Sequence, residues 1–266
     1  FRNLKNDTID LSKREVYFIG ENGQGKSNIL ESLYYSSYGV SFRTHIDSQI
    51  IKNGEKNFSV NSMYEKNNKD VQKISIIFED NKKKIEKNGK KIHDRKELIN
   101  TIPCILFCHE DLQFAIGAPE TRRFFIDQSL TLYDLTYIDD LRNYKKVLKS
   151  RNLILKSHQY DMLDVYDSQL AVLGLIIQKK RKNAIFQFNQ IFGSIFEKIT
   201  GIEGVSILYR PSWKESEISG EKKFPASQDI INLLLSQRER DKNFETTLSG
   251  PHRDRIDFVK DHRLFV

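Results

Sequence analysis

The sequence predicts an α/β fold. A segment with a glycine-rich loop and a mixed sheet with antiparallel hairpins is followed by a mainly helical segment, after which strands resume. Three observations lead to this prediction. A glycine-rich run at residues 20–27 lies between a strand-like and a helix-like segment. Apolar and polar residues alternate between residues 57 and 93, which is typical of strands. Residues 119–200 contain almost no Pro or Gly and repeat apolar residues at helical spacing.

The glycine-rich run fits the pattern G-x-x-x-x-G-K-[ST] at every required position. Its glycines let the backbone turn tightly, so that N–H groups point at phosphate oxygens. Lys26 can reach the outer phosphates of a nucleotide, and the Ser27 hydroxyl can hold Mg²⁺. The run therefore predicts an ATP site with Mg²⁺, and an ordinary Gly-rich turn is the disfavoured alternative. The predicted nucleotide-binding residues are Gly20, Glu21, Asn22, Gly23, Gln24, Gly25, Lys26, Ser27 and Asn28.

The segments on either side of this loop are the ones that a phosphate-binding loop needs. Residues 1–19 are typical of two strands, and the second, Glu15–Ile19, leads into the loop as a short apolar, buried strand. Residues 28–38 predict a helix that aims its positive N-terminal end at the phosphates and stops at Gly39.

Antiparallel strands are predicted at residues 57–93, with Asn88–Gly89 in a two-residue turn. That hairpin carries a run of lysines, which is either a solvated sheet edge or a phosphate-contacting finger. The absence of interleaved aromatic residues favours the edge. The apolar run Ile102–Phe107 predicts a strand in the middle of a sheet. Glu110 and Asp111 at its end either approach Mg²⁺ or cap the next helix.

Residues 119–200 predict amphipathic helices from a seven-residue repeat. One frame contains Leu141, Leu148, Leu155 and Met162, and a second contains Val165, Val172 and Lys179, with Gln169, Ile176 and Asn183 four residues after each. The repeat favours an antiparallel helix pair with a break near residues 157–160. An extended arm and ordinary globular helices fit it equally. A strand at 205–209, a polar loop at 212–226, a helix at 229–241 and a strand at 255–259 follow.

Composition favours a folded protein that binds a polyanion. Lys and Arg number 43 against 36 Asp and Glu, which gives a net charge of +7 and a pI near 9.2. Such a surplus favours nucleic acid as a partner, and a well-solvated surface is the alternative.

Cys104 and Cys108 lie in an apolar run and are expected to be buried thiols in a reducing compartment. The sequence has no run of membrane-spanning length and no signal peptide, which predicts a cytoplasmic protein. The first residue is Phe1, so the natural start is expected to lie upstream.

Several stretches together resemble the RecF family of bacterial recombination proteins, which is related to the ABC-type heads of chromosome-maintenance and DNA-repair ATPases. They are Gly20–Asn28, Ser41–Thr44, the Asn88–Gly89 hairpin, Glu110–Leu112, Gly117–Asp127, Tyr144, Arg151–Asn152 and Gly250–Asp254. The glycine-rich loop alone indicates only a superfamily, whereas the stretches around Arg122–Arg123 and Gly250–Asp254 are more specific. Cys108–His109 stands where the family usually has a proline, and two consecutive arginines stand where three are common.

The resemblance implies an ABC-type ATPase lobe I with the loop and an antiparallel β subdomain at 1–117. It implies a helical lobe II, or arm, at 118–245 and a return toward lobe I at 246–266. It also implies a repair role, including DNA replication and the SOS response. In that role the protein binds double-stranded and gapped or single-stranded DNA, forms an ATP-dependent homodimer, and cooperates with RecR and RecO in loading RecA. The candidate DNA contacts are Arg43, Arg122, Arg123, Lys145, Lys149 and Arg253.

The resemblance further implies a weak, DNA-stimulated ATPase in the full-length family member. The family's Ser-x-Gly-Gln signature, acidic Walker B strand and histidine-bearing switch do not occur in this chain. We therefore expect a C-terminally truncated fragment that holds ATP weakly, without hydrolysing it or dimerising on it.

Two other classes of protein also contain a phosphate-binding loop of this kind. A structural ATPase head of the SMC type would use the helices as the root of a long coiled coil, but the seven-residue repeat is too short for that. A small-molecule kinase would leave the basic helices without a purpose. Neither fits the sequence as well as an ATP-dependent DNA-binding protein.

Overall fold

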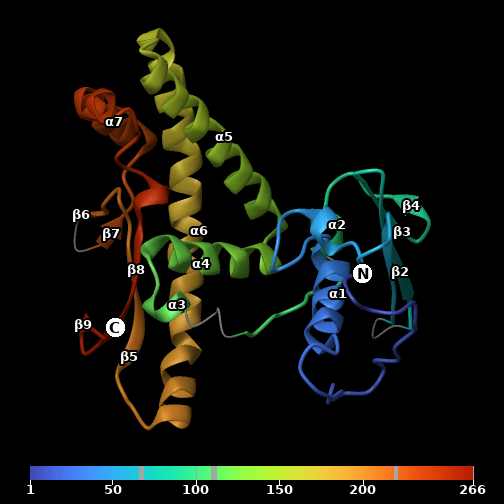
Figure 1. Ribbon diagram of the computed structural model, residues 1–266. Coiled ribbons are helices and arrows are strands. Elements are labelled where there is room, and N and C mark those ends of the chain that lie inside the picture. Colours follow the sequence, from blue (N-terminus) through green and yellow to red (C-terminus); the bar gives the residue numbers. More distant parts are fainter. Residues whose placement is uncertain (66–68, 100, 109–112, 219–220, 266) are drawn as a thin grey trace. The chain divides into compact units, whose positions relative to one another are not determined.

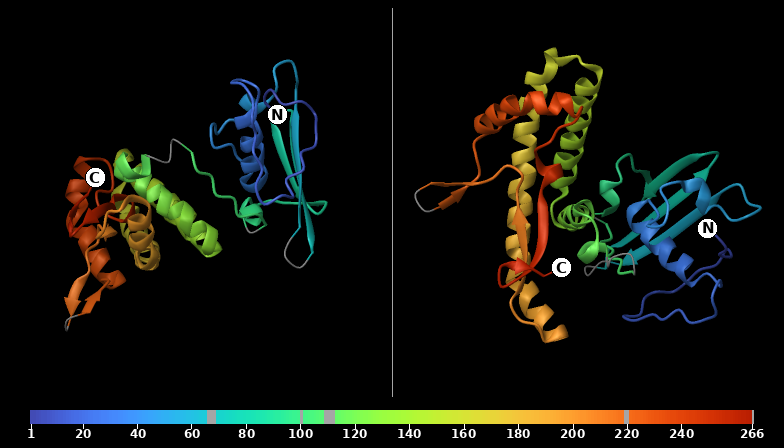
Figure 2. Two further views of the ribbon diagram at one scale, coloured as in Figure 1. Left: turned by 90° about the horizontal axis from the view of Figure 1, so that it is seen from below. Right: turned by 60° about the vertical axis from the view of Figure 1, so that its left-hand side comes forward.

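The computed structural model describes residues 1–65, 69–99, 101–108, 113–218 and 221–265 (Figures 1 and 2). The chain separates into two compact units, Phe1–Leu106 and Phe107–Val266, and each is described by itself. The lobe boundaries expected at residues 117 and 245 stay predictions. None of the helices in the described ranges combines the length and the apolar character that crossing a membrane requires.

The first unit packs one main helix against an antiparallel sheet. Its elements are α1 (Lys26–Tyr38), η1 (Asp47–Ile50), β1 (Phe58–Glu65), β2 (Val71–Glu79), β3 (Lys82–Lys87), β4 (Lys90–Lys91) and α2 (Lys96–Ile99). The strands pair in the order β1-β2-β3-β4, and Ile76 of β2 lies opposite both Val60 of β1 and Ile85 of β3. Alternate side chains of β2 are buried, and the Tyr35 ring of α1 packs on Phe58 of β1.

Several local predictions for this unit are confirmed. The strands expected at residues 57–93 form, and Asn88 and Gly89 make the tight turn with φ of +51° and +77°. Both residues need the left-handed region, which Asn and Gly tolerate best. Helix α1 ends at Gly39, whose φ of +64° and N–H bond to the Tyr35 carbonyl form the expected C-terminal cap.

Three predicted strands in residues 1–107 are wrong, the two within residues 1–19 and the one at Ile102–Phe107. Neither residues 1–19 nor Ile102–Phe107 are in strands, and Ile19 and Phe107 are 94% and 89% exposed. A strand needs a neighbour for its backbone hydrogen bonds, and no strand of the described residues pairs with either run. Apolar composition alone therefore does not produce a strand here. Cys104 and Cys108 lie in or beside the second run, half-buried, and neither is in a disulfide.

The second unit is mainly helical. Its helices are α3 (Gln113–Ile116), α4 (Pro119–Tyr133), α5 (Leu135–Ser157), η3 (Tyr160–Met162), α6 (Leu163–Thr200), α7 (Ser227–Asn243) and η4 (Pro251–Arg253). Helices α5 and α6 form the expected antiparallel pair, and α4 crosses α6 (Figure 1). The chain turns between them at His158, whose φ of +57° ends α5. This is the break predicted at residues 157–160.

Short strands pack against these helices. They are β5 (Val205–Arg210), β6 (Ser216–Ile218), β7 (Glu221–Lys223), β8 (Arg255–Lys260) and β9 (Arg263–Leu264). The sheet order is β5-β8-β9, all antiparallel, and β6 pairs only with β7. The strands expected at 205–209 and 255–259 and the helix at 229–241 are confirmed. The segment at 212–226, expected to be a loop, contains the β6–β7 hairpin as well.

The core of the second unit explains a glycine inside a long helix. Trp213 is almost fully buried, and a Cβ placed on Gly174 of α6 would lie 2.4 Å from its ring. Leu141 and Leu148 of α5 pack against this core, and Leu155 is fully buried. The first seven-residue frame therefore faces inward along α5, whereas its fourth member, Met162 of η3, is 52% exposed.

Candidate functional site

The glycine-rich loop has the backbone shape that its sequence predicts. Gly23 and Gly25 have φ of +81° and +98°, and α1 begins directly after Gly25. A Cβ on Gly25 would lie 2.8 Å from Oδ1 of Asn3 and 3.1 Å from Cδ2 of Leu4. Only glycine combines this conformation with this close approach.

The loop presents donors to the space in front of helix α1. The N–H groups of Lys26 and Ser27 lie in the first turn, where a helix supplies no acceptor, and the helix end is positive. Lys26 donates from Nζ to the carbonyls of Gly20 and Glu21, both at 2.6 Å. Ser27 is exposed. The arrangement fits a chain of phosphates held by backbone N–H groups and one ammonium.

A series of hydrogen bonds between side-chain amides connects the loop to residues outside it. Asn3 donates from Nδ2 to the Gly23 carbonyl at 2.9 Å, and its Oδ1 accepts from Nδ2 of Asn28 at 2.7 Å. Oδ1 of Asn28 in turn accepts from Nη1 of Arg43 at 2.8 Å. Each amide uses both ends, so the loop is tied to the first turn of α1 and to the segment after it.

This series of side-chain hydrogen bonds ends at the buried carboxylate of Glu31. Glu31 is fully buried and accepts from Nε and Nη2 of Arg2 at 2.5 and 2.6 Å, and from the Ser41 hydroxyl at 2.5 Å. Arg43 approaches the same carboxylate at 3.4 Å. A buried charge without such partners would be very costly. Glu31 therefore fixes the two arginines beside the loop.

Sequence reasoning missed Asn3, Arg2 and Glu31. One signal could have revealed Glu31: it shares a helix face with Tyr35 and Tyr38, at spacings of four and seven residues, and that face is buried. An acidic residue on a buried face requires a cation. Nothing in the sequence shows that the cation is Arg2.

The Gly250–Asp254 stretch lies in a buried polar network of the second unit. Arg181 of α6 donates to both oxygens of Asp127 at 2.8 and 2.9 Å, to Asp254 at 2.9 Å and to the Pro251 carbonyl at 2.7 Å. Asp254 also accepts from the Tyr209 hydroxyl at 2.6 Å. The stretch therefore joins α4, α6 and β5.

The Arg151–Asn152 pair forms a second network. Arg151 is fully buried and donates to Asp167 and Asp241, each at 2.7 Å, and to the Thr247 hydroxyl at 2.8 Å. Asn152 accepts from the backbone N–H of Thr247 at 2.9 Å. Helices α5, α6 and α7 are thus held together by one guanidinium group.

His252 connects the stretch to α5. Its Nδ1 lies 2.7 Å from the Tyr144 hydroxyl, and its Nε2 lies 2.9 Å from the Thr247 carbonyl. Burial, with a smaller contribution from the nearby guanidinium of Arg253, lowers the pKa of His252 to about 4. His252 is therefore neutral at neutral pH and has a structural place in the fold.

The candidate DNA contacts differ in their surroundings. Arg122 donates to the Ile256 carbonyl and to Asp257, each at 3.3 Å, and Arg123 donates to the Asp254 carbonyl at 2.8 Å. These contacts favour a structural role, and DNA contact by the two arginines stays a prediction. The exposed candidates are Lys145, Lys149 and Arg253, and the Arg43 side chain is 41% exposed.

Of the residues predicted to approach Mg²⁺, the structure describes Ser27. Glu110 and Asp111 lie outside the described residues. Within the described ranges, no cluster of three or more His, Cys, Asp or Glu could hold a metal ion. A hydroxyl at this position of a phosphate-binding loop suits Mg²⁺, so Ser27 stays a predicted ligand.

Comparison with known proteins gives consistent matches. A family described as AAA domain matches residues 1–249. The DNA replication and repair protein RecF of Treponema pallidum (strain Nichols) is 40% identical over 280 residues, which span 100% of this chain and 73% of that protein. RecF of Leptospira interrogans is 31% identical over 268 residues, which span 99% of this chain and 70% of that protein.

Solved structures match equally well. The recombination mediator protein RecF with ATP, from the RecFOR pathway, has a TM-score of 0.82 and 27% identity over 91% of this chain and 66% of its own. RecF with ATPrS gives the same TM-score at 28% identity, over 92% and 67%. These matches confirm the predicted fold class, an α/β P-loop ATPase lobe with a helical second lobe.

Proposed function

Because the chain belongs to the RecF family of DNA replication and repair proteins, we propose that it binds ATP at Gly20–Asn28 and uses the nucleotide as a switch in recombinational repair. The single observation that carries this proposal is the loop. Left-handed Gly23 and Gly25, the ammonium of Lys26 and the first turn of α1 converge on one space. Relatives solved with ATP and with ATPrS share the fold.

The residues present fit ATP and Mg²⁺. The backbone N–H groups of Gly25, Lys26 and Ser27 would bind phosphate oxygens, and Lys26 would add a positive charge. The Ser27 hydroxyl would bind Mg²⁺, which neutralises phosphate charge when bound. The Asn3–Asn28 pair keeps the loop in the shape that this binding needs.

DNA is the proposed macromolecular ligand, as duplex and as gapped or single-stranded DNA. Lys145 and Lys149 lie four residues apart on one exposed line of α5, and Arg253 is exposed at the end of η4. Exposed lysines in such a line suit phosphate contacts, which supply affinity without reading the sequence. Arg43 is proposed as a further contact beside the nucleotide loop.

The proposed partners follow from the family. A relative named as a recombination mediator of the RecFOR pathway supports cooperation with RecR and RecO, and through them with RecA. ATP is proposed to favour a homodimer of the complete protein.

A gel-shift titration tests the switch. We expect duplex and gapped DNA to bind more tightly with ATP and Mg²⁺ than without, and Lys26→Ala to lose that difference. Affinity should fall steeply with salt, and a Lys145→Gln/Lys149→Gln double variant should reduce the slope of log K against log salt by roughly 2. DNA binding that is indifferent to ATP and to salt would contradict the proposal.

A further inference from the structure

The second seven-residue frame of the sequence lies exposed on helix α6. Val165 and Val172 are 48% and 49% exposed, and Gln169 and Lys179 are exposed as well. Such a repeat is typical of a helix surface that packs against another helix. Helix α5 does not cover it, because α5 directs its own repeat, Leu148 and Leu155, into the core. We call this line of residues, Val165, Gln169, Val172 and Lys179, the α6 seam. It is a helix-packing surface that is exposed in the described structure.

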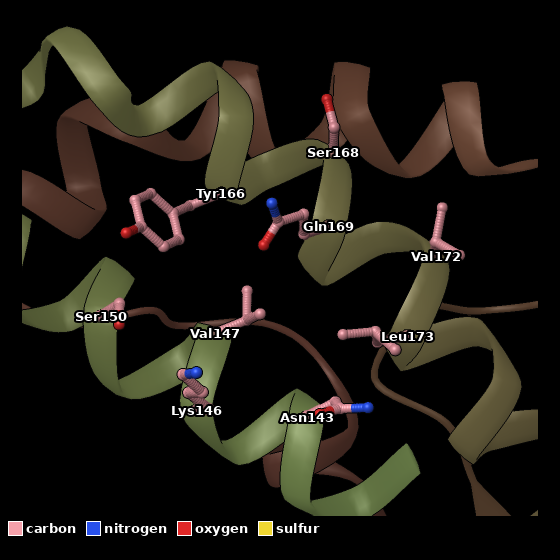
Figure 3. Close-up of a pocket in the computed structure, with 9 residues that line it drawn as sticks. All are labelled: Asn143, Lys146, Val147, Ser150, Tyr166, Ser168, Gln169, Val172 and Leu173. Carbon is pink, nitrogen blue, oxygen red and sulfur yellow. The ribbon is translucent and has the colours of Figure 1, made fainter. Parts of the chain in front are cut away.

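This seam forms one wall of a groove between α5 and α6, which we call the α5–α6 groove. Its volume is about 680 Å³, and its lining residues are Asn143, Lys146, Val147, Ser150, Tyr166, Ser168, Gln169, Val172 and Leu173. Figure 3 shows Val147 and Leu173 pointing toward one another between the two helices, with Tyr166 at one end and Asn143 at the other. The floor is apolar and the edges are polar.

The one charged residue among those that line the groove is basic. Lys146 lines it on α5, and Lys179 continues the line of Val165 and Val172 on α6. No carboxylate is among the lining residues, all of which lie in the described ranges. The proposed DNA contacts Lys145 and Lys149 lie on the neighbouring line of α5 and add to the positive charge.

We propose that the α5–α6 groove binds an amphipathic helix of a partner protein, with apolar residues toward the floor and Asp or Glu toward Lys146 and Lys179. An apolar floor of this kind suits a helix laid into a groove, with anchors three, four and seven residues apart. Asn143, Lys146 and Ser150 span two turns of α5, about 10 Å, so a partner helix of about three turns covers the groove.

Two other occupants fit less well. DNA phosphates gain from the lysines but nothing from Val147, Leu173 and Val172, which would stay in contact with water or with a polar backbone. A second copy of this chain, joined through the same groove by a two-fold axis, would place lysines against lysines. The combination of an apolar floor and basic edges therefore selects an acidic amphipathic helix. The inference does not depend on ATP binding, because every residue it uses lies in the second unit.

A displayed peptide library tests the proposal on the whole chain. A random library of about 16 residues, enough for a helix of about 24 Å, is selected against the immobilised protein. Enriched peptides are then synthesised and titrated by fluorescence anisotropy. We expect enriched sequences with apolar residues at helical spacing and a surplus of Asp and Glu, and circular dichroism should show that they gain helix on binding.

Matched variants locate the site. We expect Val172→Glu and Lys146→Glu each to weaken peptide binding at least about tenfold. Phe186→Glu, another change from an apolar residue to Glu, and Lys198→Glu, another change from Lys to Glu, lie at exposed positions of α6 outside the groove and should leave binding unchanged. Thermal unfolding confirms that each variant folds.

Three results would overturn the proposal. One is a selection that enriches no acidic helical sequence. Another is peptide binding that Val172→Glu leaves intact. The last is displacement of the peptide by a short DNA duplex whose own binding responds to Lys146→Glu but not to Val172→Glu, because that pattern would assign the groove to DNA.

Discussion

Asn3 offers the sharpest test of how the nucleotide loop is held. Replacing it by leucine keeps the size of the side chain but removes the donor to the Gly23 carbonyl and the acceptor for Asn28. The loop then loses its connection to α1 and to Arg43 while Lys26, Ser27 and the loop glycines remain. We expect Asn3→Leu to weaken ATP binding and to leave the fold intact.

The magnitude follows from the two hydrogen bonds. Each contributes about 0.5–1.5 kcal/mol net, and because both are exposed to water the lower half of that range applies. Their joint loss costs about 1–2 kcal/mol, which raises the Kd for ATP about 5- to 30-fold. The midpoint of thermal unfolding should change little, because neither bond lies in the core.

A fluorescent ATP analogue titrated against four proteins measures this effect: wild type, Asn3→Leu, Asn28→Leu and the double variant. Since Asn3 and Asn28 share a bond, the double variant should lose about 0.5–1 kcal/mol less than the sum of the single variants. The reasoning is refuted if Asn3→Leu binds ATP as the wild type does, if the two effects add fully, or if the variant loses thermal stability in proportion to affinity.

Three further variants test buried polar and charged side chains. Glu31→Gln should destabilise the protein by about 1.5–3 kcal/mol in urea unfolding, because the partly exposed Arg2 and Arg43 lose a charged hydrogen-bond acceptor, whereas Glu21→Gln on the exposed loop should not. Arg151→Met should cost about 3–5 kcal/mol by leaving Asp241 buried without a cation, while Asp167 keeps its ion pair with Arg238, and a near-wild-type stability would contradict the role given to that network. His252 has a folded-state pKa of about 4, below the ordinary 6.5, so it stays neutral in the folded protein when the unfolded chain already binds a proton. Its contribution to the free energy of unfolding is therefore complete above pH 6.5 and is lost as the pH falls toward 4. That contribution amounts to at most about 3 kcal/mol. Unfolding of wild type and His252→Gln across this range should show a shallower pH dependence in the variant, and parallel curves would contradict the assignment.

The sequence predicted those parts of the fold whose signals are local. The turn at Asn88–Gly89, the end of α1 at Gly39 and the break between α5 and α6 depend on backbone preferences that neighbouring residues reveal. The strands expected in 1–19 and at Ile102–Phe107 failed because a strand needs a partner, which composition does not supply.

The candidate site was predictable to the same extent. The loop itself follows from Gly20–Ser27, since each residue type has one physical reason to be there. The residues that hold the loop in place could not be predicted, because Arg2 and Glu31 are 29 residues apart in the sequence and come into contact only through packing. Arg151 was noticed through a family resemblance, but its place in the protein interior came from the structure.

The central claim is that Gly20–Asn28 binds ATP, and calorimetric titration of Mg²⁺–ATP into the whole chain tests it most directly. Lys26→Ala removes the ammonium at the loop, and Lys56→Ala removes an exposed lysine elsewhere in the same unit as a matched control. We expect saturable binding at one site in the wild type and in Lys56→Ala, and none in Lys26→Ala. No binding by the wild type, or equal binding by Lys26→Ala, would contradict the account.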